Sequence, residues 1–252
     1  MKVERSVDLG QKGELLVVRD ACALFEAAAE LFANAATAAI AAHGKFTVAL
    51  SGGSTPKALF ELLATEPWRS RVPWSKVHFF WGDERWVPST DKQSNYRMTN
   101  EALLSKISVP AGNVHRVETD RGTPQEAAAK YEQEVLKIVG PQPKFDLILL
   151  GLGTNGHTAS LFPHCPALNV RDRLVVSDDI EEVKMTRITF TAPLINDAQA
   201  VLFLLSGGDK APVLRDVVRG PLDQQRLPSQ LIEPLHGSLM WLADADAAAD
   251  IR

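Results

Sequence analysis

Short, continuous apolar runs recur along this chain, and most of them end in a glycine-rich loop. A run of this kind is typical of a strand buried on both faces of a parallel sheet. Segments of helical character separate the runs, and this alternation predicts an α/β fold whose mostly parallel sheet is covered on two faces. The predicted strands are 46–50, 77–81, 145–150 and 201–205, with 187–191 as a possible further strand and 238–242 as a possible last one.

Capping signals mark several of the predicted helices. Thr123 and Glu126 form a capping box around Pro124, the first helical position of its helix. Asp20 can cap the first long helix, and Gly44 can end it. The predicted helices cover 21–43, 56–63, 94–104 and 124–140.

Composition limits the kinds of partner that the chain can have. Its 252 residues, 45% of them hydrophobic and 23% charged, can bury a core, and without an internal repeat they favour a single domain over 1–252. The formal net charge of −4 argues against nucleic acid as a partner, because nucleic-acid binding calls for a basic face. A small anionic ligand remains possible, because it needs only a few local cations.

The location that we expect is the cytoplasm. Cys22 and Cys165 lie far apart and form neither a disulfide framework nor a metal pair, which fits a reducing compartment. The N-terminal segment MKVERSVDLG has no apolar core of a signal peptide. The alanine-rich stretch that follows is interrupted by Glu26, Glu30 and Asn34, so we expect an amphipathic helix and no membrane partner.

Four loops should meet at one edge of the predicted sheet, because each follows a predicted strand and parallel strands share their carboxyl edge. Open α/β sheets bind ligands at this edge. The loops are Ser51-Gly-Gly-Ser54, Gly82-Asp-Glu-Arg85, 151–157 and Ser206-Gly-Gly-Asp-Lys210.

The first loop can bind an anion. Its glycines let backbone N–H groups approach a ligand, and the helix that starts near Pro56 adds its positive end. The spacing of a Walker P-loop is absent. The alternative is a tight turn that needs glycine only for its geometry.

The second loop carries three charges. Arg85 could hold an anionic ligand or stabilise an oxyanion. Taken alone, the loop is better explained as a solvated turn with an internal Asp83–Arg85 pair.

The third loop, GLGTNGH, matches the G-x-G-x-x-G pattern of dinucleotide sites. Pro163 and Pro166 interrupt any following helix, and His157 occupies the place where a pyrophosphate should lie. We therefore interpret the match as fortuitous and His157 as a candidate general base with a pKa near neutrality. The alternative is a loop histidine without a role.

Other catalytic sites find little support in the sequence. His157, His164 and Cys165 lack a metal-ligand spacing, so no metal site is predicted. The chain lacks a G-x-S-x-G elbow, and Ser160 has no evident partners for a serine hydrolase.

Together these segments resemble the ordered blocks of the 6-phosphogluconolactonases, from about residue 46 to the end of the chain. The resemblance implies a single Rossmann-like three-layer α/β domain, similar to glucosamine-6-phosphate deaminase and ribose-5-phosphate isomerase. It also implies hydrolysis of 6-phospho-D-glucono-1,5-lactone without a cofactor, by a monomer or small homo-oligomer. The blocks are LSGGSTPKALFELL, WGDERWVP, SNYRMTNEALL, FDLILLGLGTNGHTASLFP, RITFTAPLINDA, SGGDKA and LPSQLIEPLHGSLMWLADADAA.

The resemblance also assigns roles to residues. His157 matches the catalytic histidine, and Arg85 matches the arginine of the G-D-E-R block that closes over the site. The substrate and its phosphate would be held by Gly52, Gly53, Ser54, Thr55, Asp83, Arg187 and Lys210.

One position departs from the resemblance. The family usually reads D-G-H where this chain has Asn155-Gly156-His157. An asparagine can orient the histidine through its amide but cannot take a proton as a carboxylate does.

Two other functions remain as alternatives. An amino-sugar phosphate deaminase or sugar-phosphate isomerase of the same fold needs several carboxylates, and Asn155 removes one. A non-enzymatic sugar-phosphate sensor would bind through the same loops without activating water.

Overall fold

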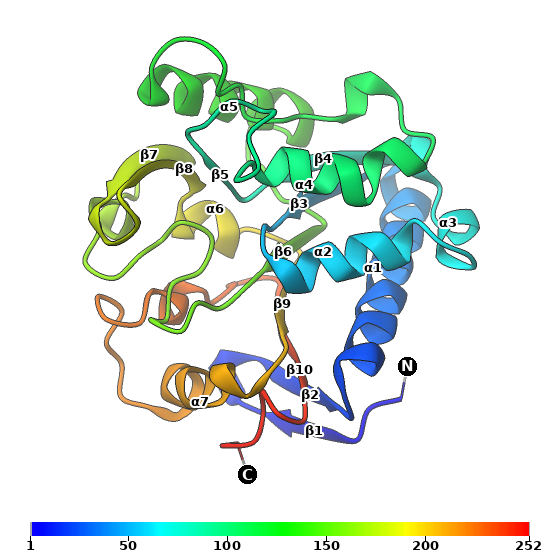
Figure 1. The fold of residues 1–252 in the computed structure, drawn as a ribbon, viewed down its shortest axis with the longest axis vertical. Coiled ribbons are helices and arrows are strands. Elements are labelled where there is room, and N and C mark those ends of the chain that lie inside the picture. The colour runs from blue at the N-terminus through cyan, green and yellow to red at the C-terminus, as the bar shows by residue number, and fades with distance from the viewer. Residues whose placement is uncertain (1, 252) are drawn as a thin grey trace.

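The computed structural model describes residues 2–251 and contains a large, mostly parallel sheet (Figure 1). Its strands lie in the order β1-β2-β10-β9-β6-β3-β4. β1 is antiparallel to β2, and every other neighbouring pair is parallel. This confirms the predicted fold class. The strands are β1 (Arg5–Asp8), β2 (Glu14–Val18), β10 (Ser238–Asp244), β9 (Ala200–Leu205), β6 (Leu147–Leu150), β3 (Phe46–Leu50) and β4 (Val77–Trp81).

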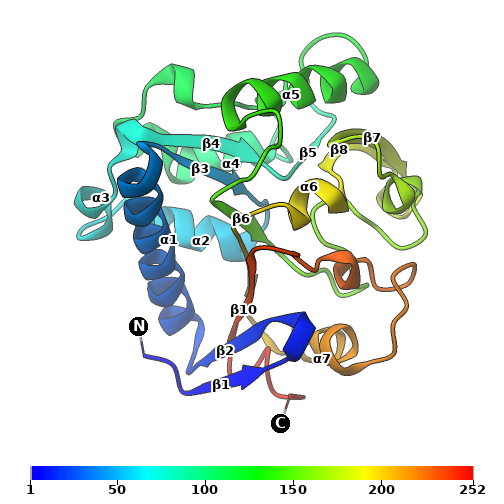
Figure 2. The same cartoon turned by 180° about the vertical axis from the view of Figure 1, so that it is seen from behind.

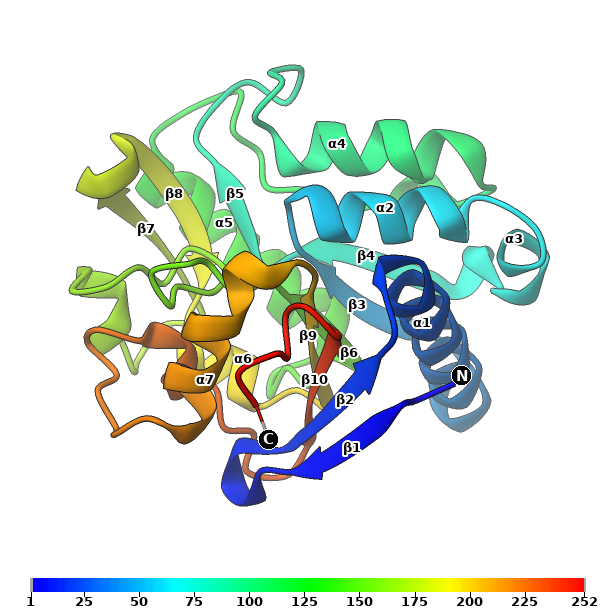
Figure 3. The same cartoon turned by 60° about the horizontal axis from the view of Figure 1, so that its bottom comes forward.

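A second, antiparallel sheet stands to one side of the main strands (Figure 3). It corrects two predictions. Gly82–Arg85 was expected to be a loop, but the chain leaves the main sheet at Gly82 and forms a short strand against β8. The strand predicted over 187–191 exists but lies outside the parallel sheet. It pairs antiparallel with β5 and β7, and its residues 187–190 are buried, the polar Arg187 and Thr189 included. The strands are β5 (Asp83–Arg85), β8 (Met185–Phe190) and β7 (Val175–Ile180).

The predicted capping signals set the helix ends. The Asp20 carboxylate accepts from the backbone N–H of Ala23, and Gly44 adopts the left-handed conformation that ends α1. The capping box of Thr123 and Glu126 is formed. The helix predicted over 94–104 is shorter, because a separate 3₁₀ turn begins at residue 104. The helices are α1 (Ala21–His43), α2 (Ser54–Leu63), α3 (Trp68–Arg71), α4 (Asn95–Ala102), α5 (Pro124–Val139), α6 (Ala192–Asn196) and α7 (Ala211–Arg219).

The helices form layers on the two faces of the main sheet. The apolar side chains of α1–α4 pack on one face, and those of α5–α7 and the small sheet pack on the other. Figure 2 shows α1 on the side opposite α6 and α7. In β4, Phe79 packs with the apolar side chains of α1–α4 and Phe80 packs on the opposite face, because neighbouring residues of a strand point to opposite sides.

The long helix α1 belongs to the core. By length and composition it could cross a membrane, with a mean hydropathy of 1.3 over 18 residues. Its Phe32 is fully buried and meets the Phe46 ring edge to face, with 5.4 Å between the ring centroids. Burying a phenylalanine contributes about 1.5–3 kcal/mol to stability. The helix is therefore part of the packed layer that the amphipathic pattern predicts.

Candidate active site

A cavity of about 270 Å³ lies at the carboxyl edge of the main sheet. β3 and β6 are neighbours in the main sheet, but the chain leaves their carboxyl ends toward opposite faces of the sheet. Open α/β sheets bind ligands in the crevice at such a point, and the cavity lies there. The four segments expected to meet do meet there. The lining residues are Ser51, Gly52, Gly53, Ser54, Thr55, Pro56, Asp83, Arg85, Gly151, Leu152, Gly153, His157, Ala159, Leu204 and Lys210.

One wall of the cavity is the N-terminus of α2. Gly53 is the N-cap residue at φ +106° and offers no side chain to the first N–H groups of the helix. Ser54 and Thr55 form the first turn at this wall. A methyl group on Gly52 would collide with the Asn95 side chain, so only glycine fits there. The uncapped N–H groups and the helix dipole suit an anion.

Lys210 and Arg85 contribute positive charge to the cavity. The Lys210 ammonium lies 3.0 Å from the Asp209 carboxylate. Arg85 donates from Nη1 to the Gln93 carbonyl oxygen at 2.7 Å, while its Nε is buried without a hydrogen-bond partner. Arg85 can therefore still bind an acceptor through its guanidinium.

Arg187 lies beside Arg85 but differs in its placement. The two residues face each other across β8 and β5. Arg187 is 8% exposed, its Nε also has no partner, and it is not among the described residues that line the cavity. Burial, and then the Arg85 charge, lower the pKa of Arg187. An anion near this pair would relieve the repulsion between the two guanidinium groups.

Asp83 and Glu84 are buried, not part of a solvated turn. The Asp83 carboxylate accepts from the Ser160 hydroxyl at 2.7 Å. The Glu84 carboxylate accepts hydrogen bonds from the backbone N–H groups of Arg85, Asn95 and Tyr96. Burial raises the pKa of Glu84. Glu84 thus ties β5 to the start of α4, a role that the sequence did not indicate.

The His157 ring lies between the backbone of one loop turn and an aromatic ring. It stacks on Phe162, with 4.1 Å between the centroids and 10° between the planes. A methyl group on Gly153 would collide with the imidazole, so this glycine makes room for it. Burial lowers the pKa of His157 to about 4, which corrects the expectation of a value near neutrality. The imidazole is therefore neutral at pH 7 and can accept a proton.

Asn155 fixes one nitrogen of that imidazole. Its Oδ1 lies 2.6 Å from His157 Nδ1. Its Nδ2 donates to both carboxylate oxygens of Glu182, at 2.9 Å each. Nothing in the sequence singled out Glu182, which comes from the turn between β7 and β8.

The G-x-G-x-x-G match is not followed by the helix that a dinucleotide site requires. After Gly156 the chain forms a turn with a bridge between Thr158 and Leu161, and the next helical turn begins only at Pro166. The interpretation as a fortuitous match is thus supported. Within residues 2–251, no group of three or more His, Cys, Asp or Glu side chains is arranged to hold a metal ion.

Comparisons with known proteins agree with this fold. Residues 19–241 match the family described as glucosamine-6-phosphate isomerases/6-phosphogluconolactonase. The chain is 45% identical to the 6-phosphogluconolactonase of Synechocystis sp. over 220 residues, which are 86% of this chain and 89% of that protein.

Solved structures are similar over nearly the whole chain. That of 6-phosphogluconolactonase from Trypanosoma cruzi superposes with a TM-score of 0.84 at 28% identity, covering 94% of this chain and 96% of the other. A monomeric glucosamine-6-phosphate deaminase superposes with a TM-score of 0.81 over 94% and 99% of the two chains. At 19% identity it shows that the fold is shared, as expected for the deaminases.

Proposed function

This chain belongs to the glucosamine-6-phosphate isomerase/6-phosphogluconolactonase family, and we propose that it hydrolyses 6-phospho-D-glucono-1,5-lactone to 6-phospho-D-gluconate in the oxidative pentose phosphate pathway. The observation that carries the proposal is the neutral His157 in a cavity that also contains an uncapped helix N-terminus and two cations. Relatives at 35–45% identity named 6-phosphogluconolactonase favour this activity over deamination.

The 6-phosphate would bind at the wall formed by α2. The backbone N–H groups of Gly53, Ser54 and Thr55 offer donors, Gly52 allows a close approach, and Lys210 adds charge. In this proposal Arg187 adds positive charge without touching the phosphate, because it is buried beside Arg85 and does not line the cavity. The phosphate is remote from the reacting carbonyl, so its binding energy fixes the lactone in place.

The chemistry needs only one group that accepts and returns a proton. With Nδ1 hydrogen-bonded to Asn155, the Nε2 nitrogen of His157 is the one that can take a proton from water. The resulting hydroxide attacks the lactone carbonyl carbon, and Arg85 would stabilise the oxyanion that forms. When the bond between C1 and the ring oxygen breaks, the imidazolium returns its proton to that oxygen, and the new carboxyl group ionises.

Asp83 would complete the substrate site. Its carboxylate lines the cavity and is held by Ser160. A carboxylate in that place can accept hydrogen bonds from the hydroxyl groups of the sugar. The negative charge also favours the imidazolium form of His157 during the reaction.

The remaining proposals concern the protein as a whole. We propose that 1–252 forms one domain that works in the cytoplasm as a monomer or small homo-oligomer. Its partner would be the sugar-phosphate lactone, with no cofactor, nucleic acid or membrane involved. The two core layers share one sheet, which supports the single domain.

The test is acid release from freshly prepared lactone at constant pH, corrected for spontaneous hydrolysis. Phosphorylated and unphosphorylated gluconolactone are compared side by side, and ammonia release from glucosamine 6-phosphate is measured in parallel. We expect turnover of the phosphorylated lactone, at least tenfold lower kcat/KM without the phosphate, and no ammonia. Equal activity on both lactones would contradict the phosphate site, and binding without turnover would indicate a sensor.

A further inference from the structure

The side chain of Asn155 bridges the candidate base and a carboxylate. Its Oδ1 faces His157, with 2.6 Å to Nδ1 and 3.2 Å to the backbone nitrogen. Its Nδ2 faces Glu182, with 2.9 Å to each carboxylate oxygen. The three residues form a chain of hydrogen bonds that ends at a formal negative charge.

Two contacts fix which end of the amide faces the histidine: the His157 backbone N–H, which requires the amide oxygen, and the Glu182 carboxylate. An ionised carboxylate only accepts hydrogen bonds, so it requires the NH₂ end of Asn155. The amide oxygen is then turned to His157 Nδ1, which must carry a hydrogen to donate. This tautomer leaves the lone pair on Nε2.

The position of Glu182 is set by the fold. It lies in the 3₁₀ turn Glu181–Val183 between the paired strands β7 and β8, where Ile180 faces Met185. The loop that carries Asn155 is fixed separately, because the Gly156 carbonyl accepts from Ser229. Two independently held segments therefore bring the amide and the carboxylate together.

We propose that Glu182 is a positioning residue for the reaction: through Asn155 it selects the Nδ1–H tautomer of His157 and supplies a negative charge that stabilises the imidazolium formed during catalysis. Asn155 makes the contact, and Glu182 contributes the charge. The kinetic part of this inference rests on the proposed lactonase function, while the tautomer is a property of the resting protein.

The first arm of the test is spectroscopic. In the wild type, ¹⁵N NMR of His157 at pH 7 should show a protonated, pyrrole-like Nδ1 and a pyridine-like Nε2. Glu182→Ala should shift the population toward the Nε2–H form, which is the more stable tautomer of an unconstrained imidazole. An unchanged tautomer in Glu182→Ala would overturn the selection by Glu182. This readout does not depend on lactone turnover, so it separates this inference from the proposed function.

The second arm is kinetic and compares the direction in which Glu182→Gln changes kcat in two backgrounds. Glu182→Gln should lower kcat about three- to tenfold with little change in KM, a modest effect because the carboxylate is exposed. In the Asn155→Asp background the same change should raise kcat, because it replaces two facing carboxylates with a carboxylate that accepts from an amide. Glu181→Gln, one residue earlier in the same turn, is the matched control and should leave kcat unchanged in both backgrounds.

The outcome depends on whether the two positions are coupled. Opposite effects of Glu182→Gln in the two backgrounds support the proposal, because a merely structural role of Glu182 would give the same sign in both. Equal effects in both backgrounds, or no effect in either, would overturn it.

Discussion

Replacing Phe162 by alanine should raise the pKa of His157, because the phenyl ring covers one face of the imidazole. The rings are nearly parallel, with centroids 4.1 Å apart. Burial lowers the pKa from its ordinary 6.5 to about 4, which disfavours the imidazolium by roughly 3 kcal/mol. Gly153 covers the imidazole from another side. Losing the phenyl group alone should therefore reverse only part of the pKa shift, about one pH unit.

The measurement is an NMR titration of the histidine Cε1–H resonances of the free protein between pH 8 and pH 3. The His157 signal is identified among the six histidines by its loss in His157→Gln. In the wild type it should stay at its neutral position down to about pH 5, and in Phe162→Ala it should begin to move at higher pH. Phe162→Leu keeps an apolar cover and is the matched control, with a midpoint close to that of the wild type.

A wild-type midpoint near 6.5 would refute this reasoning, because it would mean that the ring is solvated. A low wild-type midpoint that does not move in Phe162→Ala would show that other groups cause the desolvation. Circular dichroism at each pH checks that the variant remains folded, since removing a buried phenyl group costs about 3–5 kcal/mol.

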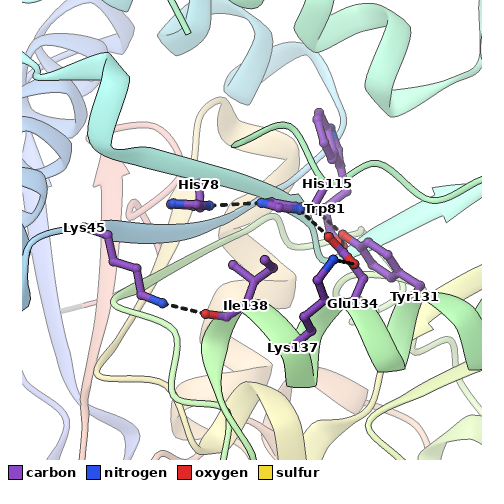
Figure 4. A network of polar contacts seen from close by, with 8 residues as sticks. All are labelled: Lys45, His78, Trp81, His115, Tyr131, Glu134, Lys137 and Ile138. Atoms are coloured by element: carbon purple, nitrogen blue, oxygen red, sulfur yellow. Dashed lines mark hydrogen bonds and ion pairs between the residues drawn. The ribbon is translucent and has the colours of Figure 1, made fainter. Parts of the chain in front are cut away.

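Three further predictions follow from the site and the core. Arg85→Ala should lower kcat about 10²- to 10³-fold and raise KM less, because an oxyanion donor acts where charge develops; normal kcat with weaker binding would instead place Arg85 at the phosphate. Lys210→Ala should raise KM about tenfold with kcat retained, a loss of about 1.4 kcal/mol of binding free energy, and an unchanged KM would exclude it from the phosphate site. Stability should fall as the pH drops below about 6.5, because burial lowers the pKa of both His78 and His115, which are joined by a 3.0 Å hydrogen bond (Figure 4). These groups take up their protons at a lower pH in the folded state than in the unfolded state, so their contribution is complete above about 6.5 and is lost toward lower pH. His115→Gln should reduce the drop in Tm between pH 7.5 and pH 5.5, and an identical drop would contradict this origin.

The parts of the site that the sequence predicts are those that depend on local signals and on sheet geometry. Gly52 and Gly53 follow a buried strand after Ser51, and Gly151 directly follows another. Because parallel strands end at one edge, their loops had to meet, and they do. The caps at Asp20 and Thr123 are similarly local, since each involves groups within three residues.

The small sheet could not be predicted in this way. β5 has only three residues, too few to show a period, and its partner Arg187 lies about a hundred positions away in the sequence. Its identity as a strand comes from the pairing with β8 and from the buried Glu84. By contrast, the apolar run 15–18 of β2 is a local strand signal of the same kind as the others, although the predicted strands do not include it.

The protonation state of His157 and the role of Glu182 depend on tertiary contacts. The pKa of His157 falls because the ring is buried, and one of its faces lies against Phe162, whose ring orientation no sequence pattern specifies. Glu182 reaches Asn155 across 27 positions and from a different sheet. Such contacts require the folded chain.

The central claim is that His157 activates water for attack on a phosphorylated lactone, and the rate of acid release by His157→Ala tests it most directly. We predict a kcat lower by about 10²- to 10⁴-fold, the usual loss for a positioned base, with KM little changed because the phosphate site is intact. A His157→Ala variant that retains the wild-type kcat would contradict the account.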